Sequence, residues 1–335
     1  MISHKQAEGL MKKANVNLVA RSGDTLMVGV TKKVPITELK IRDCVPRVVG
    51  EYMTDVVEVG EIRALPAKKK VAPMRTGKYR PAPGGVSIGH YAISAGTLGM
   101  LGKQGGVRVA LSNNHVFANS NDAELGDHIW QPGRHDGGTQ NDLIAYLYKY
   151  VPIDFGNGDS DCWFSGIVAK VLNFIWWLSG RKTRFKTIDT TVTYNLVDCA
   201  LAVGIEMNGD QFMKEILGIG IPKRFGEAKL GDKVIKSGRT TGITTGEIIA
   251  TDGYINVQYG AGKVGMFRDQ IITGPMLEGG DSGSVLLNED KETVVGLGFA
   301  GSDEVSIFNK IENVRELLGG FECVGGPDLW PDEGW

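Results

Sequence analysis

The sequence predicts a mostly β protein made of many short strands and preceded by a small α/β unit. Glycine is abundant, with 47 of 335 residues, and short apolar runs alternate with turn-forming residues. This pattern is typical of strands joined by tight turns. A chain of this length can bury one large core and a second, small one. Helical and strand patterns are mixed only in the first 60 or so residues.

The small α/β domain is predicted at residues 1–62. A helix is expected over Ser3–Lys13, with Ser3 as its N-cap, because an amphipathic pattern follows a capping residue there. The other predicted elements are strands at Val16–Ala20 and Leu26–Val30 around the turn Ser22-Gly23-Asp24, a short helix at Pro35–Asp43 and a strand at Thr54–Ile62. Oligomerisation, substrate delivery, covering of an active site and simple packing all stay open as roles of this domain.

A basic, proline-rich linker is predicted at residues 63–84, followed by a large β domain at residues 85–320 and a tail at 321–335. Three consecutive lysines in the linker, Lys68–Lys70, are interpreted as solvated charges rather than as a nucleic-acid contact. The large domain opens with GGVSIGHYAISAG, whose small and apolar residues suit a first pair of strands. His90 in this run is interpreted as a structural or surface histidine.

The most informative motif is GGDSGS at Gly279–Ser284. A serine hydroxyl is a poor nucleophile unless a base lies beside it and hydrogen-bond donors face the oxyanion that its attack creates. Flanking glycines let the backbone turn sharply, so that successive N–H groups can point into one hollow. Ser282 is therefore the candidate nucleophile, and the N–H groups of Gly280 and Ser282 are the candidate oxyanion hole. A plain turn between strands would have the same pattern.

A base and an acid for this serine are found elsewhere in the chain. His115 follows an apolar strand and a small polar turn in VALSNNHVF. Asp198 interrupts the apolar run YNLVDCALAV, so it is expected to be buried, and a buried carboxylate needs a partner. An imidazole N–H would supply that partner. The predicted catalytic residues are His115, Asp198 and Ser282.

These motifs together resemble those of the trypsin-like (chymotrypsin-fold) serine peptidases of bacterial or phage type. SNNHVF stands at the histidine motif of that family, VDCALA at its aspartate motif and GGDSGS at its serine motif. Three further stretches agree with the family: SGRTTG at Ser237–Gly242, GLGFAG at Gly296–Gly301 and IFNKIENVREL at Ile307–Leu317. The resemblance covers about residues 85–320. The pattern of the first 62 residues is similar to a segment that precedes the peptidase in some bacterial and phage members.

The resemblance implies a specific architecture and activity. Two antiparallel six-stranded β-barrels are expected, over about residues 85–205 and 220–306, with a C-terminal helix over about 307–317. The first barrel would carry His115 and Asp198, and the second would carry Ser282. The implied activity is hydrolysis of peptide bonds through an acyl-enzyme, without a cofactor.

The chain departs from the animal digestive enzymes of this family at its start. It has no Ile-Val-Gly-Gly sequence whose freed amine could pair with the aspartate before the serine. Asp281 must therefore pair with another cation. In bacterial members a basic residue just before the Ser-Gly-Arg-Thr-Thr-Gly run takes that role, which implies Lys236, with Arg239 as the reserve candidate. The site would then form without cleavage at the N-terminus.

The family also implies a substrate channel. Substrate backbone is expected to add as a strand to the wall Gly298–Gly301. The implied channel residues are Met276, Leu277, Gly298, Phe299, Ala300 and Gly301. Met276 and Leu277 lie where the family has its pocket floor and favour apolar substrate side chains, whereas Glu278 could attract lysine or arginine. The choice between these specificities stays open.

Two insertions interrupt the expected first barrel. The loop Asn119–Thr139 follows His115 and is expected to rim the cleft. Its His128 and His135 fit no metal-ligand spacing, so no metal is predicted. The second insertion contains an apolar segment at residues 167–178, which is too short to span a bilayer. It is interpreted as an amphipathic helix packed on the barrel, or as a contact for a partner, a membrane surface or a second copy of the chain.

Charge and cysteine content narrow the partners and the compartment. The formal net charge is −2, from 37 basic and 39 acidic residues, and gives no reason to expect a nucleic acid or an anionic membrane as partner. The first residues lack a signal-peptide pattern, and no disulfide spacing is evident among Cys44, Cys162, Cys199 and Cys323. A cytoplasmic protein without a transmembrane segment, acting on a protein or peptide substrate, is therefore expected.

Two other functions fit the same motifs. One is a catalytically silent protein that keeps the barrels as a binding or scaffold module. The other is a single-turnover enzyme that cuts its own connector, Ala64–Pro83, or a partner, a single time. The presence of all three catalytic residue types favours turnover over a silent module.

Overall fold

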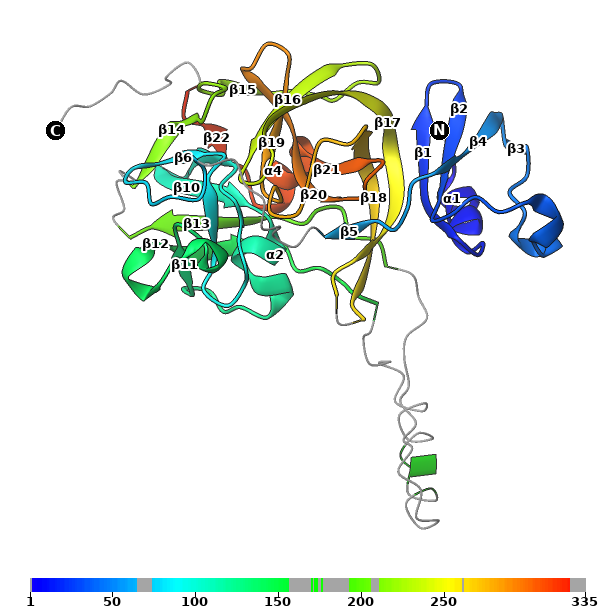
Figure 1. The fold of residues 1–335 in the computed structure, drawn as a ribbon, viewed down its shortest axis with the longest axis horizontal. Coiled ribbons are helices and arrows are strands. Elements are labelled where there is room, and N and C mark those ends of the chain that lie inside the picture. The colour runs from blue at the N-terminus through cyan, green and yellow to red at the C-terminus, as the bar shows by residue number, and fades with distance from the viewer. Residues whose placement is uncertain are drawn as a thin grey trace.

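The structure, a computed structural model, describes residues 2–64, 74–156, 170, 172–173, 176, 193–205, 211–260 and 262–325. Strands dominate this part of the chain and form two large sheets and one two-stranded sheet (Figure 1). The mostly β class predicted from the sequence is confirmed.

The second barrel is a closed ring of six antiparallel strands. Its members are β16 (Lys233–Gly238), β17 (Gly242–Gln258), β18 (Val264–Thr273), β19 (Val285–Asn288), β20 (Thr293–Gly301) and β21 (Ser306–Lys310). They pair in the order β16-β19-β20-β21-β18-β17, and β17 pairs again with β16. Closure gives each strand of the ring a neighbour on both sides over part of its length, which is how a barrel satisfies most of its backbone N–H and C=O groups.

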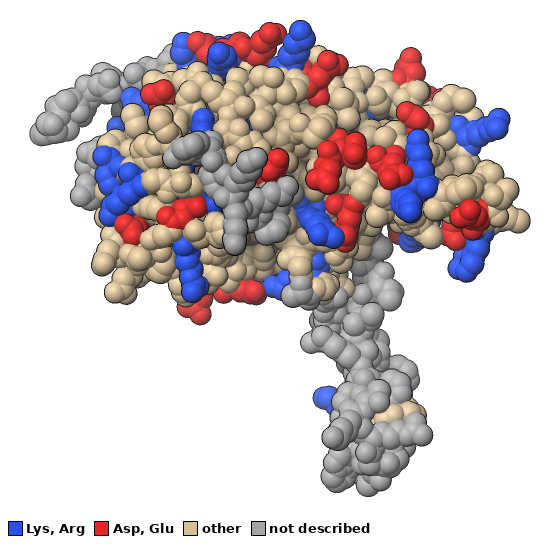
Figure 2. Space-filling view, viewed as in Figure 1, with Lys and Arg blue, Asp and Glu red and all other residues tan. Residues whose placement is uncertain are grey.

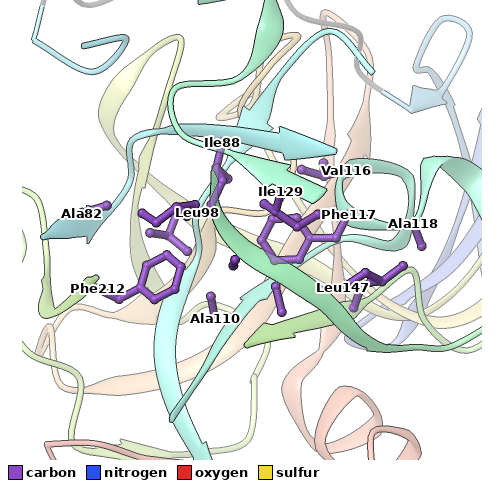
Figure 3. Close-up of a cluster of buried hydrophobic side chains, with 14 of the residues drawn as sticks. Ala82, Ile88, Leu98, Ala110, Val116, Phe117, Ala118, Ile129, Leu147 and Phe212 are labelled. Carbon is purple, nitrogen blue, oxygen red and sulfur yellow. The ribbon is translucent and has the colours of Figure 1, made fainter. Parts of the chain in front are cut away.

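The first barrel is also a ring of six antiparallel strands, one of which is interrupted. The strands are β7 (Ser87–His90), β8 (Gly96–Thr97), β9 (Met100–Gln104), β10 (Val107–Ser112), β11 (His128–Trp130), β12 (Leu143–Tyr150) and β13 (Ala200–Gly204). Here β8 and β9 follow each other as one broken strand, because the N–H of Leu98 between them donates to Val86 O at 2.9 Å. Ile88, Leu98, Phe117 and Ile129 meet in its core (Figure 3).

The predicted C-terminal helix over residues 307–317 is wrong in its first part. Strand β21 occupies Ser306–Lys310, and helix α4 spans only Ile311–Leu317. Residues Ser306–Asn309 pair with β18 on one side, and Ser306–Lys310 pair with β20 on the other. These ladder hydrogen bonds override the helical spacing of the apolar residues. Strand β22 (Glu322–Cys323) then returns the chain to β9.

The N-terminal unit contains helix α1 (His4–Met11) and strands β1 (Val16–Ser22), β2 (Thr25–Val30), β3 (Val48–Val49) and β4 (Tyr52–Glu58). Ser3 caps α1, and the side chain of Gln6 reciprocates by accepting the Ser3 N–H at 3.0 Å. The short helix predicted at Pro35–Asp43 is instead two separate 3₁₀ turns, Ile36–Glu38 and Ile41–Asp43. Ile36 and Ile41 are exposed, so no apolar face is available to hold a continuous helix.

The N-terminal unit shares a sheet with the second barrel (Figure 1). Strand β17 is 17 residues long, and its Thr251–Ile255 portion pairs with β1 after its first half has paired with β16. Leu18 of β1 is fully buried in one cluster with Ile255 and Phe267 of the barrel.

Both ends of the predicted linker are strands. Strand β5 (Arg63–Ala64) lies against β20 and β17, and β6 (Ala82–Gly84) pairs in parallel with β14 (Phe212–Ile216). A further short strand, β15 (Arg224–Phe225), pairs with β20. The lysines at 68–70 and nearly all of the apolar segment 167–178 lie outside the described residues.

Within the described ranges no helix is both long and apolar enough to cross a membrane. Cys44, Cys199 and Cys323 are free thiols, and Cys162 lies outside those ranges.

Candidate active site

His115 and Asp198 lie next to each other at the end of one strand pair. Strand β10 ends at Ser112, which pairs with Ala200 at the start of β13, so the segments that continue to His115 and lead to Asp198 run side by side. His115 lies on the one-turn helix α2 (Asn114–Phe117). Its Nδ1 is 2.6 Å from Asp198 Oδ2, and its backbone N–H donates to Asp198 Oδ1 at 3.2 Å.

Asp198 is completely buried and receives one more donor that the sequence did not suggest. The Tyr259 hydroxyl donates to Asp198 Oδ2 at 2.7 Å. Asn309 holds the backbone of the same residue, since its Oδ1 accepts the Asp198 N–H at 3.1 Å. Burial, followed by the charge of Asp198, raises the pKa of Tyr259 well above its ordinary value, so the phenol stays a donor.

These contacts leave one imidazole nitrogen for chemistry. Nε2 of His115 is buried and has no hydrogen-bond partner in the part of the chain that the structure describes. A neutral imidazole whose Nδ1–H donates a hydrogen bond to a carboxylate has a lone pair on Nε2. His115 Nε2 can therefore take a proton from a neighbouring hydroxyl.

Ser282 lies in a turn that depends on glycine. Gly280 and Gly283 have φ angles of +100° and +97°, a region that side chains disfavour. Among the described residues, the N–H groups of Gly280 and Ser282 meet no hydrogen-bond acceptor. Two unused donors beside a serine hydroxyl are the arrangement that an oxyanion requires.

The Ser282 hydroxyl does not bond His115 in this structure. Its Oγ donates instead to the Phe299 carbonyl at 3.3 Å. The two segments are nonetheless packed together, because a side chain at Gly96 would lie 2.5 Å from Val116 Cγ2 and 3.1 Å from the Ser282 carbonyl oxygen. The structure thus joins His115 to Asp198 and leaves the Ser282 side chain turned to another acceptor.

A buried ion pair lies next to the Ser282 turn and involves its residue Asp281. Lys236 Nζ lies 3.0 Å from Asp281 Oδ2, and both side chains are fully buried. Burial lowers the pKa of the Lys236 ammonium, and the Asp281 carboxylate opposes that shift. The other donors to the Asp281 carboxylate are the N–H groups of Thr240, Thr241 and Glu278 and the Thr241 hydroxyl.

Arg239, the reserve candidate for Asp281, pairs with a different acid. Its Nε and Nη2 donate to the two carboxylate oxygens of Asp136 at 2.6 and 2.5 Å. Asp136 comes from the loop after His115, so this bidentate pair ties that loop to the second barrel. A side chain at Gly280 would lie 2.6 Å from Arg239 Nη1, which places the guanidinium against the serine turn.

Three of the predicted channel residues line one cavity. Met276, Leu277 and Gly301 contribute to a cavity of about 740 Å³. Its other lining residues include five carboxylates and one guanidinium: Glu58, Glu61, Glu278, Asp303, Glu304 and Arg63. Acidic side chains gather on this face between the second barrel and the N-terminal strands (Figure 2). The cavity therefore combines buried apolar residues with an acidic rim.

The predicted wall residues follow one another along β20. Gly298 is bonded to the serine turn, since its carbonyl accepts the Gly283 N–H at 2.9 Å. Phe299 is fully buried in the barrel core. Ala300 and Gly301 pair with Ala64 and Arg63 of β5.

No cluster of three or more histidine, cysteine or acidic side chains suited to a metal occurs among the described residues. His90, which is 2% exposed, has its Nε2 at 3.1 Å from Asp127 Oδ2. Burial lowers the pKa of His90, and the contact with Asp127 opposes that shift.

The chain matches no protein-family model and no curated protein. Among solved structures it is similar to a glutamic acid specific serine protease, at 14% identity and a TM-score of 0.43, over 72% of this chain and 100% of the other. Thermobifida fusca Protease A matches at 16% identity and a TM-score of 0.45, over 72% and 99%. A Nocardiopsis protease matches at 14% identity and a TM-score of 0.45, over 72% and 98%.

Proposed function

We propose that the protein is a serine endopeptidase that hydrolyses peptide bonds through Ser282, His115 and Asp198. The observation that supports this most is the His115–Asp198 pair, a fully buried carboxylate 2.6 Å from Nδ1 of an imidazole. Such a pair makes Nε2 a base for a serine hydroxyl. The glycine turn around Ser282, with two N–H groups that lack acceptors among the described residues, supports the rest of the machinery.

In the proposed reaction the Ser282 side chain first rotates from the Phe299 carbonyl toward His115 Nε2. Its oxygen attacks the carbonyl carbon of the peptide bond while Nε2 takes the hydroxyl proton. The N–H groups of Gly280 and Ser282 donate to the oxyanion that forms. Asp198 keeps the proton on Nδ1 and stabilises the positive charge of the imidazolium.

The second half of the cycle returns the proton. His115 Nε2 protonates the leaving amine, the C–N bond breaks, and the acyl group stays on Ser282 as an ester. Water then attacks this ester, with His115 again taking and returning a proton. The carboxylic acid product is released, and the free serine hydroxyl is regenerated.

Covalent labelling tests the proposal directly. An alkyl fluorophosphonate should modify the wild type at Ser282, identified by mass spectrometry of the labelled peptide, because only an activated serine reacts. Ser282→Ala should not be labelled, whereas Ser94→Ala, on an exposed serine, should label like the wild type. Absence of labelling in the folded wild type would refute the peptidase assignment.

Turnover of the Asp198→Asn variant tests the role of the acid. The amide cannot hold the imidazole in the reactive tautomer, so kcat should fall by about 10⁴-fold while the fold is kept. The measurement is cleavage of a peptide library compared with the wild type. Equal turnover in the two proteins is incompatible with the proposed role of Asp198.

One observation favours a second candidate, a silent module with the same barrels. The Ser282 hydroxyl donates to Phe299 O at 3.3 Å, and His115 Nε2 has no partner among the described residues. A protein that used this site for binding alone would need no rotation of Ser282. Fluorophosphonate labelling decides between the two, because a silent site leaves the serine unmodified.

A further inference from the structure

The edge of β20 that faces away from β21 is covered by several successive partners. Strand β19 pairs with it only as far as Leu297. Gly298 then exchanges hydrogen bonds with the serine turn, accepting the Gly283 N–H and donating to the Ser284 carbonyl, both at 2.9 Å. The Phe299 carbonyl accepts the Ser282 hydroxyl. Beyond this point the edge would present its N–H and C=O groups to any extended chain.

That last stretch of edge is occupied by the protein's own strand β5 (Figure 1). Ala64 pairs with Ala300, and Arg63 pairs with Gly301, in antiparallel register. The Ile62 carbonyl accepts the N–H of Gln258 at 3.1 Å, on the β17 side. Because backbone groups alternate in direction along a strand, the N–H and C=O of Arg63 face β20.

The direction of β5 matters for the site. Residues 298–301 lead along β20 away from Ser282, so an antiparallel chain beside them runs toward Ser282. The C-terminal end of β5, at Ala64, is therefore the end nearest the serine turn. An extended peptide added to this edge, with its backbone leading to the nucleophile, would have to take the same register and direction.

Side chains hold β5 in place. Ile62 is 1% exposed and belongs to the same core cluster as Phe299 and Ala300. Val59 is fully buried in that cluster as well. Arg63 is the only basic residue among the described residues that line the 740 Å³ cavity, to which the barrel contributes the carboxylates of Glu278, Asp303 and Glu304. Packing and charge thus both favour the docked position.

We propose that β5 is an intramolecular occupant of the substrate channel, so that the chain blocks its own site until Arg63 and Ala64 leave the edge of β20. This proposal rests on the proposed peptidase function, and it adds that strand β5 regulates the access of a peptide substrate to Ser282. An incoming peptide must compete with a segment of the same chain. Its apparent affinity is then lowered by the fraction of molecules in which β5 is undocked.

An opening variant tests the proposal without requiring catalysis. Arg63→Pro removes the N–H that faces β20, while Arg63→Ala keeps that N–H and removes the same charge. Both are made in a Ser282→Ala background, and binding of a fluorescein-labelled peptide GEIRA, the sequence of residues 60–64, is measured by anisotropy. We expect the proline variant to bind at least about tenfold more tightly than the alanine variant. Equal binding by the two, or binding by neither, would overturn the proposal.

A locking variant covers the case in which Arg63→Pro does not fold. Ala64 and Ala300 form the pair next to Arg63–Gly301, so their Cα atoms should lie about 4.5 Å apart, within the range of a disulfide. In Ala64→Cys/Ala300→Cys, also with Ser282→Ala, oxidation should abolish peptide binding and reduction should restore it. Unchanged binding on oxidation, with the disulfide verified by mass, would contradict the proposal.

The two proposals fail separately. Fluorophosphonate labelling of Ser282 reports on the catalytic assignment, and peptide binding in the Ser282→Ala background reports only on channel access. If Ser282 is labelled but the Arg63→Pro and Arg63→Ala variants bind peptide equally, the peptidase assignment stands and the proposed self-block is refuted. If peptide binding by the disulfide variant depends on oxidation but Ser282 is not labelled, the self-block stands and the site is catalytically silent.

Discussion

Asp198 is a carboxylate in a place where a lone charge would be very costly. It is fully buried, and its two oxygens accept from His115 Nδ1, the His115 N–H and the Tyr259 hydroxyl. These hydrogen bonds compensate the carboxylate for the hydration that burial removes. In the proposed mechanism Tyr259 is a positioning residue, since it contacts Asp198 and not the imidazole nitrogen that takes the proton.

Tyr259→Phe should weaken both stability and catalysis. Loss of a hydrogen bond to a charged group costs about 1.5–3 kcal/mol. We expect kcat/KM to fall by about tenfold, since a tenfold loss needs only about 1.4 kcal/mol of transition-state stabilisation. Denaturant unfolding and peptide hydrolysis measure the two effects. Unchanged values in both would show that the phenol does not support Asp198.

The same variant should alter the alkaline stability profile. The folded pKa of Tyr259 is raised, by burial first and then by Asp198, above the ordinary value of 10.0. Above that pH the unfolded tyrosine loses its proton while the folded one keeps it, so stability falls by up to about 1.4 kcal/mol per pH unit. In Tyr259→Phe the free energy of unfolding should therefore fall less steeply with pH in this alkaline range. Tyr148→Phe, which changes a 45% exposed tyrosine, should follow the wild type.

A substitution of Lys236 tests whether its buried ion pair with Asp281 stabilises the Ser282 turn. Lys236→Met leaves Asp281 as a buried charge without its cation, which costs about 3–5 kcal/mol. The matched control is Lys223→Met, because Lys223 pairs with Glu292 at 2.5 Å on the surface and such pairs contribute at most about 1 kcal/mol. Urea unfolding of both variants measures the difference. A loss no larger for Lys236 than for Lys223 would contradict the buried role of this pair.

The residues of the candidate site differ in how clearly the local sequence marks them. His115, Asp198 and Ser282 lie in short local motifs, and the first two are in contact. Tyr259 was missed because it lies 61 positions from Asp198 with no motif around it. A long-range hydrogen bond of this kind has no local sequence signal, since only the folded sheet brings the partners together.

At the scale of the element, the turn Gly279–Ser284 needs glycine for two separate reasons. Gly280 has a φ of +100°, and a side chain there would lie 2.6 Å from Arg239 Nη1. Gly280→Ala should therefore displace one of the two oxyanion donors, and kcat should fall by about a hundredfold or more. Gly106→Ala is the control, because Gly106 has a φ of +86° but open space around it. It should lose stability and retain turnover; equal turnover in both variants would refute the role of the turn.

Element types were predictable where the pattern had a single explanation. Ser3 caps a helix and glycine turns separate strands, as the sequence predicted. The helix predicted over 307–317 failed in its first half because Ile307 and Phe308 satisfy either helical spacing or strand pairing. Neighbours supplied by β18 and β20 decided the outcome, and these are invisible in the local sequence.

At the scale of the whole molecule, the N-terminal unit and the second barrel form one continuous sheet. The sequence indicated the two barrels and a preceding α/β unit, but strand pairing between distant segments was outside its reach. Strand β17 extends past β16 and meets β1, and β5 returns from the N-terminal unit to the wall of the channel. Loss of structure in the N-terminal unit is therefore expected to affect the edge of β20, where we propose that substrate binds.

This continuity predicts coupled unfolding. Leu18 and Leu26 are both completely buried, but Leu18 packs with Ile255 of the barrel, whereas Leu26 packs in the cluster under α1. Each change to alanine should cost about 2–5 kcal/mol locally. Hydrogen exchange read by mass spectrometry should show lost protection in β17 and β18 for Leu18→Ala, and only in the N-terminal elements for Leu26→Ala. If Leu18→Ala opens the N-terminal strands alone, the unit is an independent folding body and its sheet contact with the barrel carries no coupling.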